Sequence, residues 1–181
     1  MRELIADLFV TVDGYARGRD SPAFFGYAGP DLDAWIDEQT GRPHVMVMGA
    51  NTYRVLAEMA DDPTSSRMTA LPKIVFSRSL RAPLSWANTM LIADDVATAV
   101  PALKAEPGDP LRVIGSLSLV RSLLRLGLVD RLRLMLFPQV LGASGDEPVF
   151  AELPDLNLDL ATTSVLDGRL VLLEYRPQAP P

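Results

Sequence analysis

Short apolar runs alternate with amphipathic segments along most of the 181 residues. Continuous apolar runs of strand length are typical of parallel strands that are buried on both faces. Apolar residues at three- and four-residue spacing indicate helices that pack one face on a sheet. The pattern predicts strands at Leu4–Val10, His44–Met48, Lys73–Phe76, Thr89–Ile92, Leu111–Ile114 and Leu132–Phe137, and helices at Asp31–Gln39, 50–59, Ala93–Ala105 and Ser116–Leu126.

The C-terminal part of the chain carries a different signal. Asp167-Gly168 is a strong hairpin turn signal between two apolar strands, Leu156–Thr163 and Leu170–Tyr175. Strands that alternate with helices imply βαβ units and a parallel sheet. We therefore expect one α/β domain over residues 1–175, with a mixed but mostly parallel sheet, a polar loop at 61–67 and a frayed tail at 176–181.

Composition excludes several kinds of chemistry. The chain has no cysteine and one histidine, so disulfides, thiolate metal sites, a cysteine nucleophile and a two-histidine metal site are excluded, and we expect no metal. The net charge of −6 argues against general nucleic-acid binding. We see no signal-peptide pattern and no bilayer-length apolar run, and expect a cytoplasmic protein that contacts neither membrane nor nucleic acid. Catalysis must then use carboxylates, hydroxyls, backbone amides, arginines or a cofactor.

Three predicted strand ends carry glycine, hydroxyl or arginine residues. Ligands of open α/β sheets bind beyond the carboxyl ends of the strands, where helix N-termini offer free N–H groups to anions. Each end also has an ordinary explanation as a tight turn, a solvated arginine or a helix cap. The three ends are Gly49-Ala50-Asn51-Thr52, Ser77-Arg78 and Gly115-Ser116-Leu117.

Acidic and basic residues offer further candidates. Asp33 and Asp37 share one face of a predicted acidic helix that also contains Asp31. A carboxylate that points into an apolar cleft has a raised pKa and can donate a proton, although acids near a helix N-terminus are also ordinary surface residues. We expect a structural role for His44, and a solvated helix face for a basic series formed by arginines 112, 121, 125, 131 and 133.

Several ordered motifs together resemble a known family. They are Val12-Asp13-Gly14-Tyr15-Ala16, Met48-Gly49-Ala50-Asn51-Thr52-Tyr53, Val75-Phe76-Ser77-Arg78, Ile114-Gly115-Ser116, and Leu126-Gly127-Leu128-Val129-Asp130 followed by Leu136-Phe137-Pro138-Gln139-Val140-Leu141-Gly142. Over about residues 2–175 the chain resembles the dihydrofolate reductase-like superfamily. Within it, the chain is most similar to the RibD C-terminal domain group, the reductases of riboflavin biosynthesis.

The resemblance implies a three-layer fold around an eight-stranded sheet, NADPH as the hydride donor, and a homodimer. Gly49 and Thr52 would lie at the pyrophosphate, Ser77 and Arg78 at the 2′-phosphate of the adenosine. The cofactor assignment as a whole covers Gly49, Asn51, Thr52, Ser77, Arg78, Gly115, Ser116 and Leu117. The substrate assignment covers Asp13, Gly14, Phe137 and Pro138.

The chain departs from the family pattern at two positions. Ala50 replaces an arginine or lysine that many members carry, and Ser116 replaces the second of two glycines. Because Ala50 cannot contact the 2′-phosphate, the expected preference for NADPH depends more on Arg78.

The resemblance also bears on the proton donor and on the substrate. By position, Asp33 best matches the catalytic acid of dihydrofolate reductases, with Asp31 and Asp37 as competitors. We expect an NADPH-dependent reductase that acts on a C=N or C=O of a pyrimidine- or pterin-like substrate, 5-amino-6-(5-phosphoribosylamino)uracil being one. The alternatives are dihydrofolate reductase itself and a non-catalytic, dimeric nucleotide-binding relative.

Overall fold

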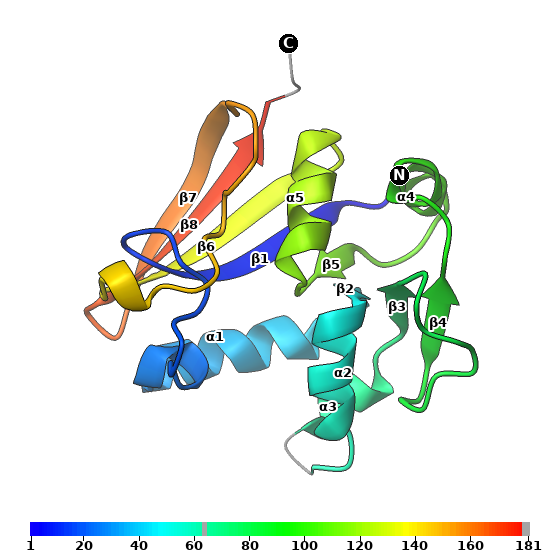
Figure 1. The fold of residues 1–181 in the computed structure, drawn as a ribbon, viewed down its shortest axis with the longest axis horizontal. Coiled ribbons are helices and arrows are strands. Elements are labelled where there is room, and N and C mark those ends of the chain that lie inside the picture. Colours follow the sequence, from blue (N-terminus) through cyan, green and yellow to red (C-terminus); the bar gives the residue numbers. More distant parts are fainter. Residues whose placement is uncertain (63–64, 179–181) are drawn as a thin grey trace.

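A computed structural model describes residues 1–62 and 65–178 of the chain. The described residues form an eight-stranded sheet in the order β4-β3-β2-β5-β1-β6-β8-β7, drawn in Figure 1. The strands are β1 (Leu4–Thr11), β2 (Val45–Gly49), β3 (Lys73–Phe76), β4 (Thr89–Ile92), β5 (Leu111–Val113), β6 (Arg131–Phe137), β7 (Leu158–Leu166) and β8 (Leu170–Pro177). The helices are α1 (Pro30–Gly41), α2 (Ala50–Glu58), α3 (Ser66–Ala70), α4 (Val96–Ala105) and α5 (Leu117–Arg125).

In this spatial order, each strand from β4 across to β6 pairs in parallel with its neighbour, whereas β8 pairs antiparallel with both β6 and β7. The α/β class, the mostly parallel sheet and the antiparallel C-terminal hairpin predicted from the sequence are therefore confirmed. Described residues contain no helix with the length and apolar content that crossing a membrane requires.

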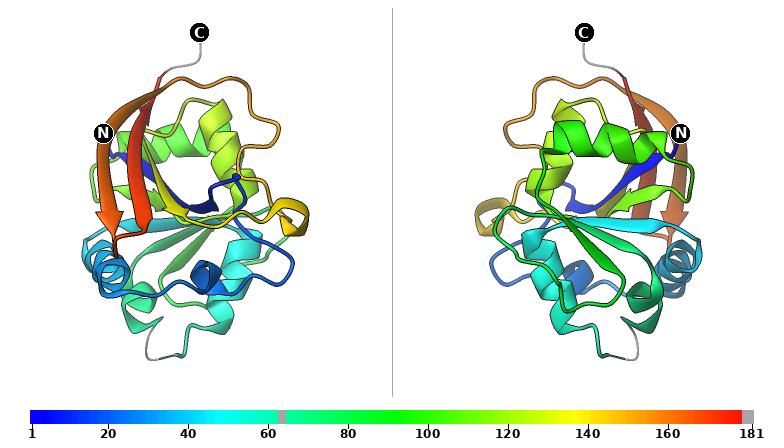
Figure 2. Two further views of the ribbon diagram at one scale, coloured as in Figure 1. Left: turned by 90° about the vertical axis from the view of Figure 1, so that its left-hand side faces the viewer. Right: turned by 90° about the vertical axis from the view of Figure 1, so that its right-hand side faces the viewer.

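Helices cover both faces of the sheet and make three layers, which Figure 2 shows from two sides. The strand periodicity of two decides which layer each side chain joins. Leu4 and Leu8 of β1 face the core under α4 and α5, where Leu123 is fully buried. The opposite face carries Phe9 of β1, which packs against Trp35 of α1 with ring centroids 6.2 Å apart. The sheet thus separates the core under α4 and α5 from two apolar clusters on its other face.

Most element boundaries differ from the sequence prediction by one or two residues, and three larger or more informative differences follow. The predicted loop 61–67 ends early, because α3 begins at Ser66. Helix α4 begins at Val96 and not at Ala93, since the Asp95 carboxylate accepts a hydrogen bond from the Ala97 N–H at 2.9 Å and caps the helix there. The hairpin strands run longer than predicted, and β8 continues to Pro177 inside the expected tail, of which residues 179–181 lie outside the described part.

Lys73 fastens the end of α3 to β3 from inside the protein. Its side chain is 1% exposed, and its ammonium donates hydrogen bonds to the carbonyls of Met68, Thr69 and Leu71 at 2.6–3.0 Å. The ammonium also lies 4.6 Å from the centroid of the Trp86 ring. Burial lowers the pKa of Lys73 to about 8. Hydrogen bonds to the three carbonyls offset the free-energy cost of taking this cation out of water.

We predict that Lys73→Met lowers the free energy of unfolding by about 3 kcal/mol, because three buried carbonyls lose their donor while the volume is kept. Urea denaturation followed by circular dichroism measures the change. Arg81→Met is the matched control, since the Arg81 guanidinium also donates to backbone carbonyls but is exposed. Equal losses in the two variants would contradict the structural role of Lys73.

Candidate functional site

Two helices begin at the carboxyl ends of neighbouring strands. Strands β2 and β5 pair in parallel, with Val47 opposite Val113, and α2 and α5 start one and four residues after these strands end. Neither first turn is capped by a side-chain hydrogen bond. The first N–H groups of both helices and the positive ends of their dipoles therefore remain available to an anion.

Close contact between Gly49 and Gly115 brings these helix starts together. The Gly49 N–H donates to the Gly115 carbonyl at 3.1 Å. A Cβ on Gly49 would lie 2.2 Å from the Ser116 hydroxyl oxygen, and one on Gly115 would lie 2.5 Å from that of Thr52. Gly115 also has a φ of +139°, and the peptide bond that follows it is cis. The positive φ and the contact with Thr52 therefore require glycine at 115, whereas a Cβ at 49 would fit only if the Ser116 hydroxyl turned away.

Two adjoining cavities follow this edge of the sheet, on either side of the glycine contact. The cavity toward β3 measures about 410 Å³ and the cavity toward β1 about 710 Å³. Both are lined by Asn51, Ser116 and Ser118, so they form one trough across the strand ends. The structure brings together all eight residues assigned to the cofactor, since each lines this trough: Gly49, Asn51, Thr52, Ser77, Arg78, Gly115, Ser116 and Leu117.

At the β3 end of the trough, one cation faces acidic neighbours. Arg78 has a side chain that is 77% exposed and lies 3.6 Å from the Asp95 carboxylate. The Ser77 hydroxyl is already used by the turn, because it accepts hydrogen bonds from the N–H groups of Ser79 and Leu80. Asp94 and Asp95 line the same cavity. An anion bound here would meet attraction from Arg78 and repulsion from the two acids.

The residues assigned to the substrate lie beside the trough and are not among its lining residues. The Asp13 carboxylate accepts hydrogen bonds from the Thr11 hydroxyl and from the N–H groups of Leu141 and Gly142, which lowers the pKa of Asp13. Gly14 has a φ of +85° in the same turn.

Phe137 and Pro138 serve the packing next to this turn. Phe137 is 0% exposed in the α1-side core, and the Pro138 carbonyl accepts from the Tyr27 hydroxyl at 3.2 Å. In this structure the four residues fix the loop after β1 against the segment after β6; their contact with substrate stays a prediction.

The three candidate acids of α1, which are Asp31, Asp33 and Asp37, also lie outside the trough. Asp33 is exposed, and Asp37 forms an ion pair of 3.2 Å with Arg67. Asp31 accepts from the N–H of Asp167, whose carboxylate in turn accepts from the N–H groups of Asp31 and Leu32. Asp31 and Asp167 thus cap α1 and dock the β7–β8 turn on it. The catalytic role of Asp33 stays a prediction from sequence.

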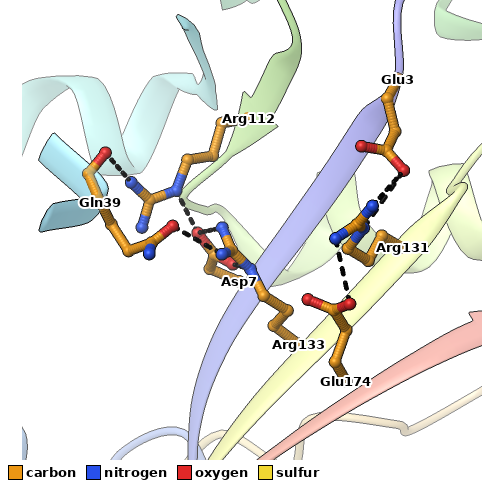
Figure 3. Close-up of polar contacts among 7 residues, drawn as sticks. All are labelled: Glu3, Asp7, Gln39, Arg112, Arg131, Arg133 and Glu174. Carbon is orange, nitrogen blue, oxygen red and sulfur yellow. Dashed lines mark hydrogen bonds and ion pairs between the residues drawn. The ribbon is translucent and has the colours of Figure 1, made fainter. Parts of the chain in front are cut away.

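A buried cluster of charges contradicts the expectation that the arginine series solvates a helix face. Figure 3 shows the Asp7 carboxylate between Arg112 and Arg133, with Nε of Arg133 at 2.6 Å and an ion pair to Nε of Arg112. All three side chains are at most 10% exposed. Gln39 completes the cluster, because its carbonyl accepts from Arg112 at 2.8 Å and its side-chain oxygen accepts from Arg133 at 2.6 Å.

The other arginines of the series are also engaged. Arg131 pairs with Glu3 and Glu174, while Arg121 and Arg125 donate to backbone carbonyls of the segment that precedes β7. The sequence signal for the buried cluster was the placement of a charge between apolar neighbours within predicted strands, as at Asp7 and Arg112. Successive side chains of a strand point to opposite faces of the sheet, so a charge within a buried strand enters a layer beside the sheet and cannot belong to a helix face.

Asp7 and Arg112 give the trough a charged floor at its β1 end. Both line the larger cavity, together with the apolar side chains of Phe9, Leu56 and Ile114. Described residues contain no group of three or more carboxylate or histidine side chains arranged to hold a metal ion. The chemistry that this end offers is therefore charge recognition within an apolar pocket.

The pKa of the His44 imidazole depends on the charges of this cluster. Its Nδ1 lies 2.7 Å from the Arg42 carbonyl oxygen, and its ring is 5% exposed. Burial lowers the pKa of His44, the guanidiniums of Arg112 and Arg133 lower it further, and the Asp7 carboxylate opposes them. A neutral imidazole is thus the form that fits beside the two cations.

We predict that His44, the one histidine of the chain, titrates below 6.5 in an NMR pH series, and that Asp7→Asn lowers this pKa further by removing the opposing negative charge. Because the folded-state pKa is depressed, the unfolded chain takes up this proton first, and the protein loses stability as the pH falls below 6.5. Glu3→Gln, in the neighbouring Arg131 ion pairs, should leave the titration of His44 unchanged. A rise of the pKa in Asp7→Asn would refute the arrangement.

Comparison with known proteins gives this geometry a context. The chain is 26% identical to the uncharacterized protein YyaP of Bacillus subtilis over 183 residues, which cover 96% of this chain and 94% of that one. Among solved structures it is similar to a candidate riboflavin biosynthesis protein of Shewanella sp. PV-4, with a TM-score of 0.79, 22% identity, and 98% and 99% of the two chains covered. It is also similar to dihydrofolate reductase of Enterococcus faecalis, solved in complex with NADP(H) and RAB-propyl, with a TM-score of 0.66, 14% identity and 98% and 97% coverage. The model of the RibD C-terminal domain matches residues 2–172, and the chain belongs to this family.

Proposed function

We propose that the protein is an NADPH-dependent reductase that transfers a hydride to a C=N or C=O of a small pyrimidine- or pterin-like substrate. The observation that carries the proposal is the trough in which all eight predicted cofactor residues meet at two uncapped helix N-termini. Membership of the RibD C-terminal domain family supports it, as does the likeness to a dihydrofolate reductase that binds NADP(H).

The residues of the trough fit such a cofactor. The free N–H groups at the starts of α2 and α5 suit a diphosphate, and the absence of side chains at Gly49 and Gly115 leaves its approach open. Arg78 is the cation available to a 2′-phosphate at the β3 end. When bound, the cofactor supplies the hydride.

The chain's own contribution is orientation, exclusion of water and control of charge. Phe9, Leu56 and Ile114 provide apolar walls at the β1 end, where the substrate would lie. A proton for the reduced atom comes from water at the open mouth of the trough or, as the family resemblance suggests, from Asp33.

Two other functions follow from the sequence: dihydrofolate reductase itself, and a nucleotide-binding relative without turnover. A reductase is favoured over mere nucleotide binding because the trough continues past the cofactor residues into the cavity with the charged floor. Tight NADPH binding without oxidation across a panel of pyrimidine, pteridine and imine compounds would favour the non-catalytic relative.

We predict that NADPH quenches protein fluorescence with a micromolar Kd, and that Arg78→Ala weakens NADPH about tenfold, the loss of roughly one exposed charge-assisted contact. Asp95→Asn should tighten NADPH binding, because it removes a repulsive charge while asparagine still caps α4. NADH binding should change in neither variant, since NADH lacks the 2′-phosphate.

Arg81→Ala is the control for this series, because Arg81 is a nearby exposed arginine outside the lining of the trough. Absence of NADPH binding by the wild type in the micromolar range would end the cofactor assignment. An Arg78→Ala variant that binds NADPH as tightly as the wild type would end the role of Arg78 alone.

We also propose that the chain forms a homodimer through β7, as the family resemblance implies. Strand β7 is the outer strand of the sheet and exposes Leu160 and Val165, which are 57% and 62% accessible. An open strand edge with apolar side chains favours association with another chain.

Light scattering is expected to give twice the chain mass of 19.7 kDa, and Val165→Asp is expected to restore the monomer by placing a charge in the contact. Met90→Asp, on β4 at the opposite edge of the sheet, changes a side chain that is 59% exposed and should leave the dimer intact. A wild-type mass equal to one chain would remove the proposal.

A further inference from the structure

The cluster under the larger cavity carries more positive than negative charge. Arg112 and Arg133 share one carboxylate, that of Asp7, and all three side chains are at most 10% exposed. The remaining partners are neutral: the carbonyl and side-chain amide of Gln39 accept hydrogen bonds, and the Trp35 ring lies 5.8 and 5.6 Å from the two guanidinium carbons. A buried cation without a full counter-charge is costly, so the cluster favours an additional anion.

The excess charge is directed at the cavity through Arg112. Asp7 and Arg112 line the cavity, whereas Arg133 does not. Both Asp7 oxygens and all three nitrogens of Arg133 make hydrogen bonds, as do Nε and Nη1 of Arg112. Among these charged groups of the described chain, Nη2 of Arg112 alone makes no hydrogen bond to the protein. Arg112 is 8% exposed and lines the cavity, so the N–H groups of this nitrogen are the donors that the cluster leaves free for a ligand.

The other charges of the cavity do not neutralise Arg112. Asp146 and Glu147 at the mouth both pair with Arg17, at 2.9 and 3.1 Å. Arg121 donates to the carbonyls of Pro148 and Val149, and no ion pair of Arg121 with a carboxylate is found among the described residues. The two acids and two arginines at the mouth therefore balance one another in charge, and they do not offset the positive charge of the floor.

We propose that Arg112 binds an anionic or electron-rich oxygen of the substrate, with Asp7 and Arg133 as positioning residues that hold its guanidinium. The substrate class is a small planar molecule that carries a carboxylate or ring oxygen conjugated to the bond to be reduced. Its ring would pack between the apolar side chains of Phe9, Leu56 and Ile114. The recognition of an anion stands on the cavity alone, while its link to reduction rests on the proposed function.

The position of the charge also suits the reaction. When the carbon of a C=N bond gains a hydride, the electron pair of that bond moves to the nitrogen, which takes a proton from water. A ring carbonyl oxygen that is conjugated through this nitrogen bears part of the negative charge in the transition state. A buried guanidinium held in place before reaction stabilises such charge strongly, because no solvent needs to reorganise. Arg112 would then contribute to turnover as well as to binding.

Benzoate and benzamide are the probes that test the proposal, because they share a planar ring but differ in charge. His44 lies beside the cluster and supplies the readout, an NMR signal that needs neither cofactor nor turnover. We expect benzoate to raise the pKa of His44 saturably at millimolar concentration, by adding a negative charge, at constant ionic strength. Benzamide should produce no such rise.

Arg112→Gln is expected to weaken benzoate at least roughly tenfold, as expected for the loss of a charge-assisted hydrogen bond. In this variant Asp7 keeps Arg133 as its counter-ion, so the buried pair stays neutral. Arg131→Gln is the matched control, since Arg131 is another ion-paired arginine of the same sheet that lines neither cavity of the trough (Figure 3). It should bind benzoate as the wild type does.

Equal effects of benzoate and benzamide on the wild type, or no effect of benzoate up to the solubility limit, would overturn the proposal, and neither result depends on a variant folding. Undiminished benzoate binding by folded Arg112→Gln would overturn it too. NADPH binding, measured separately by fluorescence, keeps the two proposals distinguishable. Arg112-dependent benzoate binding without any NADPH binding would refute the reductase and leave the anion site standing, and the converse would do the opposite.

Discussion

The contact between Gly49 and Gly115 is the constraint on which the rest of the site depends. Strands β2 and β5 are neighbours, and their following turns approach so closely that a Cβ on Gly115 would meet Thr52 and a Cβ on Gly49 would meet the Ser116 hydroxyl. This approach places the starts of α2 and α5 side by side and joins the two cavities into one trough. A methyl group on Gly115, where φ is also positive, would strain the turn and displace Thr52, so the free N–H groups of the two helix starts would move apart.

In a protein with a net charge of −6, any anionic ligand must be attracted by local groups. The trough offers two different kinds of positive group for this. At the middle, uncapped helix N-termini supply partial positive charge that desolvates no ionised side chain. At the β1 end, two guanidiniums around one carboxylate supply a full charge, which is buried and therefore weakly screened. The long-range repulsion of the whole chain is screened by salt, while these short-range attractions persist.

The sequence allowed prediction of whatever depends on local pattern. The buried parallel strands, the hairpin at Asp167-Gly168 and the glycine and hydroxyl residues at three strand ends are all local features, and the structure gathers those ends in one trough. Contacts between distant segments were beyond such patterns. The reciprocal capping of Asp31 and Asp167 joins residues 136 positions apart, and the bonds of Asp7 to Arg112 and Arg133 span 105 and 126 positions. No periodicity reveals which of several charges along a chain will meet.

The same division between local and distant contacts applies to the two ends of the trough, and the two ends therefore give different information about function. The cofactor half is built from backbone N–H groups and glycines, which many sequences supply at the same places in a fold, so family membership speaks to this half. The end proposed for the substrate is built from side chains, among them Asp7, Arg112 and Phe9. Fold likeness at 14–22% identity carries no information about such side chains. The search for a substrate should therefore start from the charge at this end of the trough, and not from the substrates of proteins that share the fold.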